Sequence, residues 1–454
     1  MTNKLLSILI ILSVSVALGP RTAQGYTLQY LDNSGILARR WLISPILISF
    51  SSSLADPPPN IKHDSDVIAT VRRALRHWED ACKVRFVEVT TSVQTVSPPH
   101  LGDGVNLITV SVDNEPLFRS SENPAMTRVF FDASGAITEA DIALNPHQDF
   151  STDGSPGTYD LESTLTHEIG HLIGLDHSGV IAATMQPRQA KNGTYGLPAF
   201  TQRTLSDDDK AAARSLYGPR SGSAGISGRL LTNNNGRAQT IFGAHVFAED
   251  ATGRVAAGSV TLANGEYRLD GLPSGEYRLI GQSLNGPVAA REISSSGSYA
   301  TLAETTPAFR SFVGTGQNSS EITILRPNAT VDSPFFVLSN PPPSLKPELI
   351  GMNDELSTAP LPLQPGKTFT IYVAGVGVDE LRADGIFISS PLITVNARSF
   401  REEFFEVLYP VISFEITVSP DISRGDYSIH LASPSGEQAY LAGAITIDSA
   451  QNGK

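Results

Sequence analysis

Residues 167–177 read His-Glu-Ile-Gly-His-Leu-Ile-Gly-Leu-Asp-His, and this stretch decides the fold of the first part of the chain. On a helix, residues four apart lie one turn apart on the same face, so His167 and His171 can direct their imidazoles at one point. Gly174 predicts a sharp turn at the end of that helix, three residues before His177. The spacing therefore predicts a metal site made of three histidines.

The residue types in this stretch favour a catalytic zinc site. Three nitrogen ligands with one position left for water is the arrangement of a catalytic rather than a structural zinc. Zinc lowers the pKa of a bound water to about 7 and polarises a carbonyl. Glu168 lies beside His167 without being a ligand, so its carboxylate can accept the proton of the zinc-bound water. The stretch therefore predicts Zn²⁺ held by His167, His171 and His177, with Glu168 as the catalytic base.

The stretch 167–177 resembles the metzincin clan of zinc proteases, and Ser178 after the third histidine resembles its matrixin branch. Met185 stands where matrixins place the methionine of the Met-turn beneath the zinc. Pro187 stands where the family builds the wall of its S1′ substrate pocket. The closing stretch 205–218 is similar to the last helix of the family.

The resemblance covers about residues 36–218 and implies a fold and an activity. The fold is an α+β catalytic domain with a twisted, mostly parallel five-stranded sheet, three helices and a cleft across the zinc. Residues 127–131 are similar to the antiparallel edge strand on which an extended substrate lies, and the alternative for them is an ordinary core strand. The implied activity is that of a secreted zinc metalloendopeptidase, a hydrolase that acts on proteins or peptides such as those of the extracellular matrix.

Several features depart from the family pattern. The one cysteine, Cys82, lies inside the catalytic stretch, so a pro-segment cysteine that caps the zinc is not expected. The structural-zinc loop of the family is not recognisable, and Gln189 replaces the tyrosine that usually follows the pocket proline. Structural Ca²⁺ is left open, with four loop carboxylates as candidate oxygen ligands: Asp132, Asp141, Asp153 and Asp160.

Hydrophobic periodicity predicts the elements around this site. Strands are expected at 41–50, 86–89 and 106–112, and a hairpin at 127–131 and 137–144. Helices are expected at 67–80, from a cap at Thr158 or Asp160 to about 172, and from Ser206 to just before Gly218.

The beginning of the chain predicts export. Residues 1–25 combine Lys4, an apolar run from Leu5 to Leu18 and a small-residue site before Tyr26, which is typical of a signal peptide. The apolar run is too short to cross a bilayer about 30 Å thick, so no membrane span is expected. A formal net charge of −13 argues against nucleic acid as a partner.

The rest of the 454-residue chain predicts a multidomain protein with two all-β sandwich domains. A zinc protease domain at 26–218 and a linker at 219–224 precede β-sandwiches at 225–340 and 345–449. Gly-Glu-Tyr-Arg-Leu occurs at 265–269 and again at 275–279, which predicts a β-hairpin. The first sandwich resembles the carboxypeptidase-regulatory-like modules of bacterial surface and secreted proteins, and the second resembles Ig-like IPT/TIG modules.

Two functions remain open at this point. The first is the zinc endopeptidase. The second is a surface adhesin or binding protein that uses a protease-like scaffold. The intact Glu168 argues against this alternative, because a site that has lost its catalytic activity does not need to keep its base. In either case the β-sandwiches are candidates for binding a surface or a substrate polymer.

Overall fold

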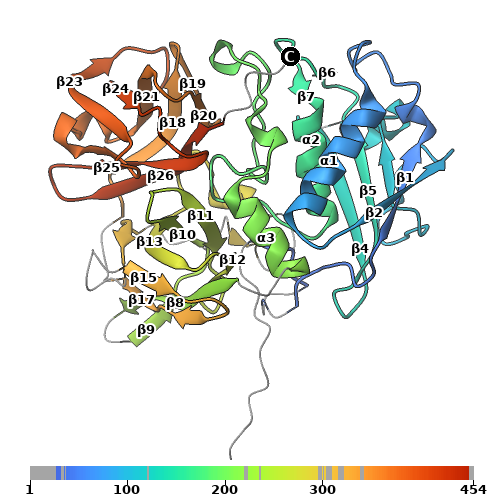
Figure 1. Cartoon of the computed structure of the whole chain (residues 1–454), viewed down its shortest axis with the longest axis horizontal. Helices are drawn as coiled ribbons and strands as arrows, with labels where there is room; N and C mark the ends of the chain where they lie inside the picture. The colour runs from blue at the N-terminus through green and yellow to red at the C-terminus, as the bar shows by residue number, and fades with distance from the viewer. Residues whose placement is uncertain are drawn as a thin grey trace, which may run out of the picture.

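The computed structural model of the chain describes residues 27–31, 35, 37–119, 122–218, 223–234, 237–294, 299, 301–302, 309–314, 322–337 and 342–448. Figure 1 shows three regions: helices with a sheet on the right, and two regions made mostly of strands on the left. We call residues 37–218 the first region, 224–337 the first β region and 346–447 the second β region. The predicted export segment 1–25 lies outside the described residues, as does most of the predicted linker.

A five-stranded sheet, in the order β2-β1-β3-β5-β4, forms the core of the first region. Its strands pair in parallel, except that β4 is antiparallel to β5 and lies at one edge. The predicted edge strand 127–131 falls within β4. The strands are β1 (Ile46–Ser51), β2 (Phe86–Thr91), β3 (Leu107–Thr109), β4 (Ala125–Phe131) and β5 (Ile137–Leu144), followed by the short parallel pair β6 (Phe150–Ser151) and β7 (Tyr159–Asp160).

Two of the predicted strands are too long. The strand expected at 41–50 begins only at Ile46, because Pro45 has no N–H for the ladder and Trp41 donates to other elements. The strand expected at 106–112 ends at Thr109. Ser111 then accepts a hydrogen bond from the Asp113 N–H and caps the 3₁₀-helix η2 (Val112–Leu117).

The described part of the first region has three α-helices: α1 (Val67–Ala81), α2 (Leu161–Leu172) and α3 (Asp207–Tyr217). Helix α2 packs on β4 and β5 of the sheet, and α1 packs on α2. Ser206 and Asp209 form the predicted capping box of α3, which satisfies free N–H groups of its first turn. The buried Trp78 of α1 donates from Nε1 to the Thr166 carbonyl of α2 at 2.9 Å. This bond fixes α2, which carries the predicted site, against α1. The short 3₁₀-helices are η1 (Ser52–Leu54), η3 (Thr194–Gly196) and η4 (Thr201–Arg203).

The first β region consists of two sheets. One has the order β11-β10-β13-β14 with β15 beside β13, and the other has β12-β8-β16 with β9 and β17 beside β8. The strands are β8 (Ala224–Asn234), β9 (Arg237–Thr240), β10 (Ala244–Asp250), β11 (Val255–Val260), β12 (Glu266–Leu272), β13 (Gly275–Ser283), β14 (Phe312–Val313), β15 (Ile322–Leu325), β16 (Thr330–Asp332) and β17 (Phe335–Val337), with the 3₁₀-helix η5 (Ala290–Glu292) after β13.

The predicted hairpin of the Gly-Glu-Tyr-Arg-Leu repeat is wrong. The two copies lie in β12 and β13, but β12 pairs with β8 and β13 pairs with β10, in different sheets. Tyr267 and Leu269 of one copy and Tyr277 and Leu279 of the other are buried in the same hydrophobic core. The chain therefore crosses from one sheet to the other between the copies. Alternation of apolar and polar residues gives the same pattern for this crossing as for a hairpin.

The second β region also has two sheets, in the orders β19-β18-β21-β24-β23 and β20-β26-β25-β22. It encloses a hydrophobic core of its own. The strands are β18 (Lys346–Met352), β19 (Glu355–Ser357), β20 (Leu361–Leu363), β21 (Thr368–Val376), β22 (Ile386–Ile388), β23 (Ile393–Glu403), β24 (Val411–Val418), β25 (Gly425–Ala432) and β26 (Gln438–Ile447), with the 3₁₀-helices η7 (Val378–Glu380) and η8 (Ala383–Gly385).

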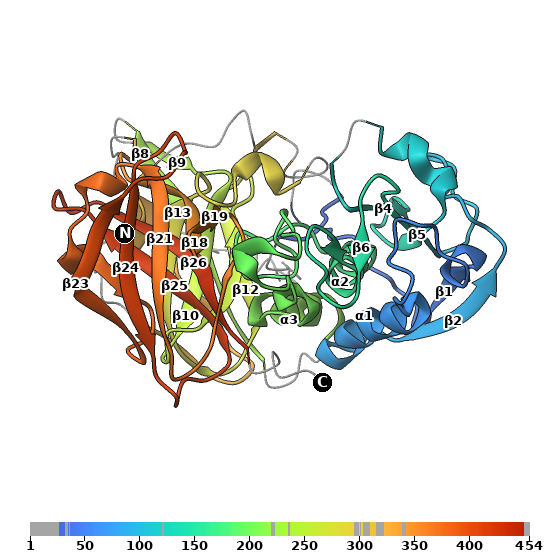
Figure 2. The ribbon, with the colours of Figure 1, turned by 90° about the horizontal axis from the view of Figure 1, so that it is seen from above.

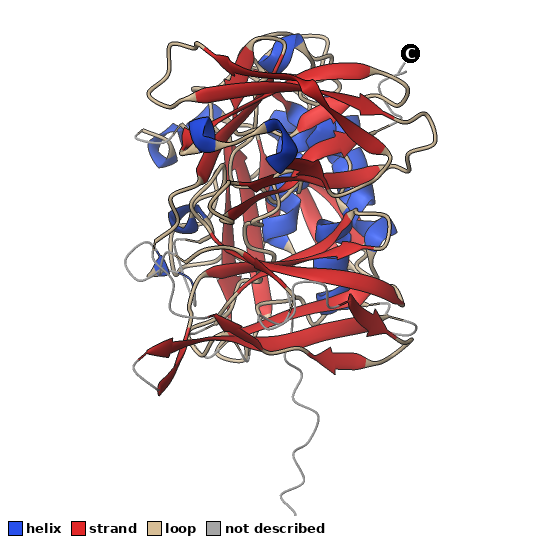
Figure 3. Ribbon diagram, turned by 90° about the vertical axis from the view of Figure 1, so that its left-hand side faces the viewer, coloured by secondary structure: helices blue, strands red, loops and turns tan. Residues whose placement is uncertain are grey.

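The regions are packed together closely rather than joined by linkers alone. Figure 2 shows α3 between the rest of the first region and the β regions, and α3 contacts β11 and β12. Figure 3, which looks onto the β regions, shows them stacked one above the other. One hydrophobic core contains side chains of all three α-helices and of β8, β10, β12 and β13. Two first-region residues, Ile181 and Tyr195, belong to the core of the second β region.

The first described residues of the chain join this packing. Leu28 forms a β-bridge with Leu175, next to the predicted metal site, and Tyr30 packs on Tyr299 of the first β region.

Cys82 is free and buried at the end of α1, and burial raises the pKa of its thiol to about 11. None of the described helices has the length and apolar character needed to cross a membrane.

Candidate metal centre

Helix α2 carries the first two predicted ligands. Asp160 is its N-cap and accepts a hydrogen bond from the Ser163 N–H at 2.9 Å. The same carboxylate is paired with the Arg203 guanidinium at 2.6 Å, and almost all of the helix is buried. Because both its start and its faces are fixed, α2 holds His167 and His171 one turn apart on one face.

A turn at Gly174 brings in the third predicted ligand. Gly174 has φ of +99°, a conformation that side chains other than glycine rarely adopt. A Cβ atom there would lie 2.2 Å from the carbonyl oxygen of Arg39. The chain can therefore reverse at this point, close against the residues before β1, and return His177 to the other two histidines.

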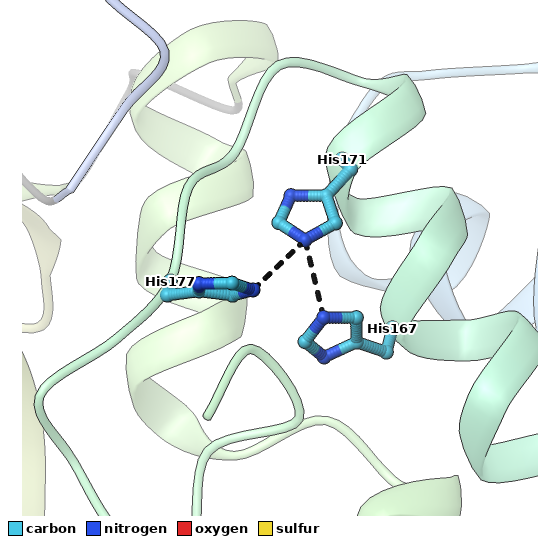
Figure 4. Close-up of side chains that lie close together, drawn as sticks. All are labelled: His167, His171 and His177. Atoms are coloured by element: carbon cyan, nitrogen blue, oxygen red, sulfur yellow. Dashed lines mark hydrogen bonds between the residues drawn. The ribbon is translucent and has the colours of Figure 1, made fainter. Parts of the chain in front are cut away.

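The three histidines converge, as Figure 4 shows. His171 Nε2 lies 3.1 Å from His167 Nε2 and 3.2 Å from His177 Nε2. Within the part of the chain that the structure describes, these three are the one group of His, Cys, Asp or Glu residues close enough to hold a metal ion. Two nitrogen ligands at about 2.0–2.1 Å from a tetrahedral zinc would be about 3.3 Å apart, so the spacing suits zinc.

The other ring nitrogen of each histidine fixes its tautomer. Nδ1 donates to a backbone carbonyl in every case: to Thr184 from His167 at 2.7 Å, to Leu175 from His171 at 2.9 Å and to Glu292 from His177 at 2.6 Å. A neutral imidazole that donates from Nδ1 has only a lone pair on Nε2. The three Nε2 lone pairs therefore face one another, an arrangement that a cation stabilises and that zinc-binding histidines typically show.

Burial also keeps the three imidazoles neutral. It lowers the pKa of His167 to about 3, and it lowers the pKa of His171 and of His177 below the usual value. Neutral histidine is the form that binds metal. The donor set, the tautomers and the protonation states therefore all fit a zinc ion.

Glu168 lies beside this set with a partner from the edge strand. Its side chain is buried, which raises the pKa of the carboxyl to about 7, and a hydrogen bond from Thr127 opposes that rise. Thr127 of β4 has Oγ1 at 2.5 Å from Glu168 Oε2 and 3.1 Å from the Glu168 carbonyl oxygen. The carboxylate is thus held between the metal-binding helix and the strand predicted to receive substrate.

Met185 lies directly against α2. It is buried, and a Cβ atom on Gly170 would come within 2.2 Å of its sulfur, so any larger residue at 170 would displace the Met185 side chain. The N-terminus of α3 holds this segment, because Asp209 accepts from the N–H groups of Thr184 and Met185 at 2.7 and 3.1 Å. Pro187 follows, half-buried, at the start of the loop that leads away from the site. Gln189, two residues after Pro187, accepts a hydrogen bond from Thr164 of α2 at 2.9 Å.

The β regions hold this same loop, which the sequence did not reveal. The Tyr195 hydroxyl lies 2.9 Å from the Ala359 carbonyl oxygen and 3.2 Å from that of Ile350, and both acceptors belong to the second β region. Asp208 of α3 accepts from Ser178 Oγ and from the Gly258 N–H of β11, each at 2.6 Å. No local pattern marks these residues, because their partners lie far away along the chain.

The four candidate calcium carboxylates lie apart, each with protein partners. Asp160 caps α2, Asp153 pairs with Lys62, Asp141 accepts from backbone N–H groups at 97 and 107, and Asp132 accepts from those of its own turn. The calcium prediction gains no support among the described residues.

Comparison with known proteins agrees with the site. The sequence profile of the matrixin family matches residues 51–218. The chain is 31% identical over 185 residues to the hatching enzyme of Paracentrotus lividus, an alignment that covers 39% of this chain and 26% of that protein. It is 28% identical over 183 residues to metalloendoproteinase 1 of Glycine max, covering 39% and 53%. Stromelysin-1 of Rattus norvegicus is 29% identical over 153 residues, covering 34% and 29%.

The first region is therefore a zinc metalloendopeptidase domain. Its particular type is matrixin-like, as the matched profile and the similar proteins agree. The chain spans about a quarter to a half of the length of these relatives. Among solved structures, a minor pilin of Streptococcus agalactiae matches 28% of this chain and 48% of its own at 13% identity, with a TM-score of 0.19. That score carries no argument about fold or function.

Proposed function

We propose that this protein is a secreted, zinc-dependent endopeptidase that hydrolyses peptide bonds of extracellular proteins. The observation that carries the proposal is the convergence of three neutral histidines beside the buried Glu168. The matrixin match to the same residues supports it. The proposal covers the activity of the whole chain, its substrates and its location.

In the proposed reaction, His167, His171 and His177 hold the metal. When bound, zinc supplies a Lewis acid that acidifies water and polarises a carbonyl. Glu168 takes the proton released by the attacking water and then donates it to the leaving amine. The hydrogen bond from Thr127 holds the carboxylate in place through this exchange. Burial of Glu168 and His167 keeps bulk water from competing for these two groups.

The edge strand suggests how substrate binds. β4 pairs with β5 on one side only, so its other side has backbone groups available for an extended peptide. The Thr127 contact places this strand directly beside the catalytic carboxylate. Pro187 and the residues after it form the opposite wall in this proposal, and Gln189, held by Thr164, limits the pocket there.

Export rests on the sequence of residues 1–25, whose charged start, apolar run and small-residue site are typical of a signal peptide. Binding of a surface or polymer by the β regions stays a prediction. The contacts described above support a further role for these regions, which is to hold the first region in place.

Digestion of casein by the purified full-length chain tests the proposal, with and without a chelator. We expect wild type to cleave casein and to contain one zinc per chain by mass spectrometry. Glu168→Ala should keep the zinc and lose about 10²–10⁴-fold in kcat/KM, because the ligands survive and the base does not. Glu380→Ala, an exposed glutamate of the second β region, is the matched control and should cleave normally.

A wild-type chain that neither cleaves casein nor binds stoichiometric zinc would contradict the proposal. It would favour the alternative of a binding protein on a protease-like scaffold. Loss of zinc in Glu168→Ala would contradict the role of Glu168 as a base that is not a ligand.

A further inference from the structure

The third zinc ligand has a partner outside the matrixin-like domain. His177 Nδ1 donates to the carbonyl oxygen of Glu292 at 2.6 Å, and Glu292 follows 115 residues later, in η5 of the first β region. The corresponding acceptors for His167 and His171 are Thr184 and Leu175, both close to the ligands in sequence. The bond that orients His177 therefore comes from a different region of the molecule.

The Glu292 side chain makes two further contacts. Oε1 accepts from Arg188 Nε at 2.6 Å, and Oε2 accepts from the Ala289 N–H at 2.9 Å. The Ala289 contact caps η5 and so fixes the direction of the Glu292 carbonyl. The Arg188 contact ties η5 to the residue after Pro187, in the predicted wall of the substrate pocket. One residue thus touches both a metal ligand and that wall.

Neighbouring residues keep η5 at this place. Ile293 is fully buried in the hydrophobic core that also contains residues of α2. Ser294 is hydrogen-bonded to the Asp176 carboxylate, and Asp176 immediately precedes His177. The 3₁₀-helix and the ligand loop are therefore joined along several consecutive residues, so the Glu292 contact is part of a packed interface.

We propose that Glu292 is a positioning residue for the zinc site, which holds the His177 ring through its carbonyl and the Arg188 segment through its carboxylate. The acceptor on Nδ1 fixes the ring rotation and makes Nε2 a stronger donor to the metal. Zinc affinity and the geometry at the third ligand then depend on the first β region. The inference rests on the proposed function, since it requires the three histidines to bind zinc.

The test uses the full-length chain and measures the metal itself. Zinc affinity is obtained by competition with a chromophoric chelator, and ligand geometry from the visible absorption spectrum of the Co²⁺-substituted protein. The Glu292→Ala variant keeps the carbonyl that accepts from His177 and loses the side-chain contacts that fix its direction. We therefore expect zinc binding to weaken about 10-fold, the lower end of the effect of removing a partner that supports a ligand, and the Co²⁺ spectrum to change. Glu292→Gln keeps an oxygen for the cap of η5 and should restore most of the affinity.

Two other variants separate positioning from general stability. Arg188→Ala removes the ion pair and leaves the cap of η5, so it should weaken zinc binding severalfold and also change the spectrum. Glu276→Ala removes an exposed glutamate of β13 in the same β region and should leave both measurements unchanged. If Glu292→Ala does not fold, Arg188→Ala decides the question by itself.

Wild-type zinc affinity and an unchanged Co²⁺ spectrum in Glu292→Ala, or in Arg188→Ala where the first is unfolded, would overturn the inference. A lower melting temperature with normal metal binding would overturn it as well, because it shows a merely structural role. Failure of the proposed function is a different result: in that case the wild-type chain itself would not bind stoichiometric zinc.

Discussion

The two halves of the candidate metal centre are built in different ways. The helix half, with His167, Glu168 and His171, lies on one capped and buried element, and its supports come mostly from the same region. The loop half, with His177, Met185 and Pro187, has no regular structure of its own. Distant residues such as Asp209, Glu292 and those around Ala359 hold it in place.

The difference shows which part of the site can vary independently. The helix half follows from spacing and capping, so it stays the same wherever the helix is packed. The loop half takes its shape from whatever packs on it, and here both β regions do so. We therefore expect proton transfer to depend on the helix half. The hold on the third ligand and the substrate preference should depend on the β regions.

Removal of zinc should have the largest effect and should separate the two halves. We expect chelation to abolish cleavage while the far-UV circular dichroism stays nearly unchanged, because capping and burial hold α2 without metal. Hydrogen exchange should increase first at residues 177–188 and much less at 161–172. Faster exchange in the helix than in the loop would contradict the comparison, and re-addition of zinc with return of activity is the control.

Gly174→Ala changes the turn that connects the helix half to the loop half. The new Cβ would meet the Arg39 carbonyl, and the positive φ is strained for alanine, so we expect a loss of roughly 1–3 kcal/mol in unfolding free energy with weaker zinc binding. Gly436→Ala has a positive φ of +82° but open space around its Cβ. Urea denaturation of Gly436→Ala therefore measures the cost of the backbone strain without a steric clash. This variant should bind zinc with normal affinity. Equal effects of the two variants would argue against a steric role of Gly174.

Tyr195→Phe weakens the attachment of the loop to the second β region. Loss of the hydroxyl leaves two buried carbonyls without this donor, so we expect a loss of about 1 kcal/mol in stability. Because the loop carries the predicted pocket wall, KM for a peptide substrate should rise severalfold with kcat nearly unchanged. Tyr427→Phe, which loses a bond to Ser423 within the second β region, should leave KM as it is. A fall in kcat alone would place the effect in the helix half.

The effect furthest from the histidines concerns pH and the contact of α3 with the first β region. Burial and the nearby Asp209 raise the pKa of Asp208 to about 7, against hydrogen bonds from Ser178 and Gly258. The folded state therefore binds this proton more tightly than the unfolded state does. The resulting stabilisation is complete below about pH 4 and is lost as the pH rises through about 7.

Asp208→Asn cannot titrate, so its melting temperature should fall less than that of wild type between about pH 4 and pH 8. Differential scanning calorimetry across this range measures the slope. Asp113→Asn, at an exposed site in η2, serves as the control and should keep the wild-type slope. A wild-type slope in Asp208→Asn would show that another group titrates.

The sequence predicted what is determined locally. The spacing of His167 and His171, the cap at Asp160, the turn at Gly174 and the capping box at Ser206 all act within a few residues, and the structure has each of them. The β-hairpin predicted from the repeat at 265–279 was wrong, because an alternating pattern shows which side chains are buried and does not show which strands pair. Glu292 and Tyr195 are ordinary residues in their own segments. Only the packing of the whole chain gives them a role at the site.

Residues far apart in the sequence hold the ligand loop: Leu28 pairs beside it, and the Ile181 N–H donates to the Ala442 carbonyl at 2.9 Å. A ribosome completes α2 long before it adds β26. A nascent or truncated chain would therefore carry two histidines on a formed helix while the third still lacked its supports. Completion of the candidate site therefore depends on residues that are translated well after the metal-binding helix.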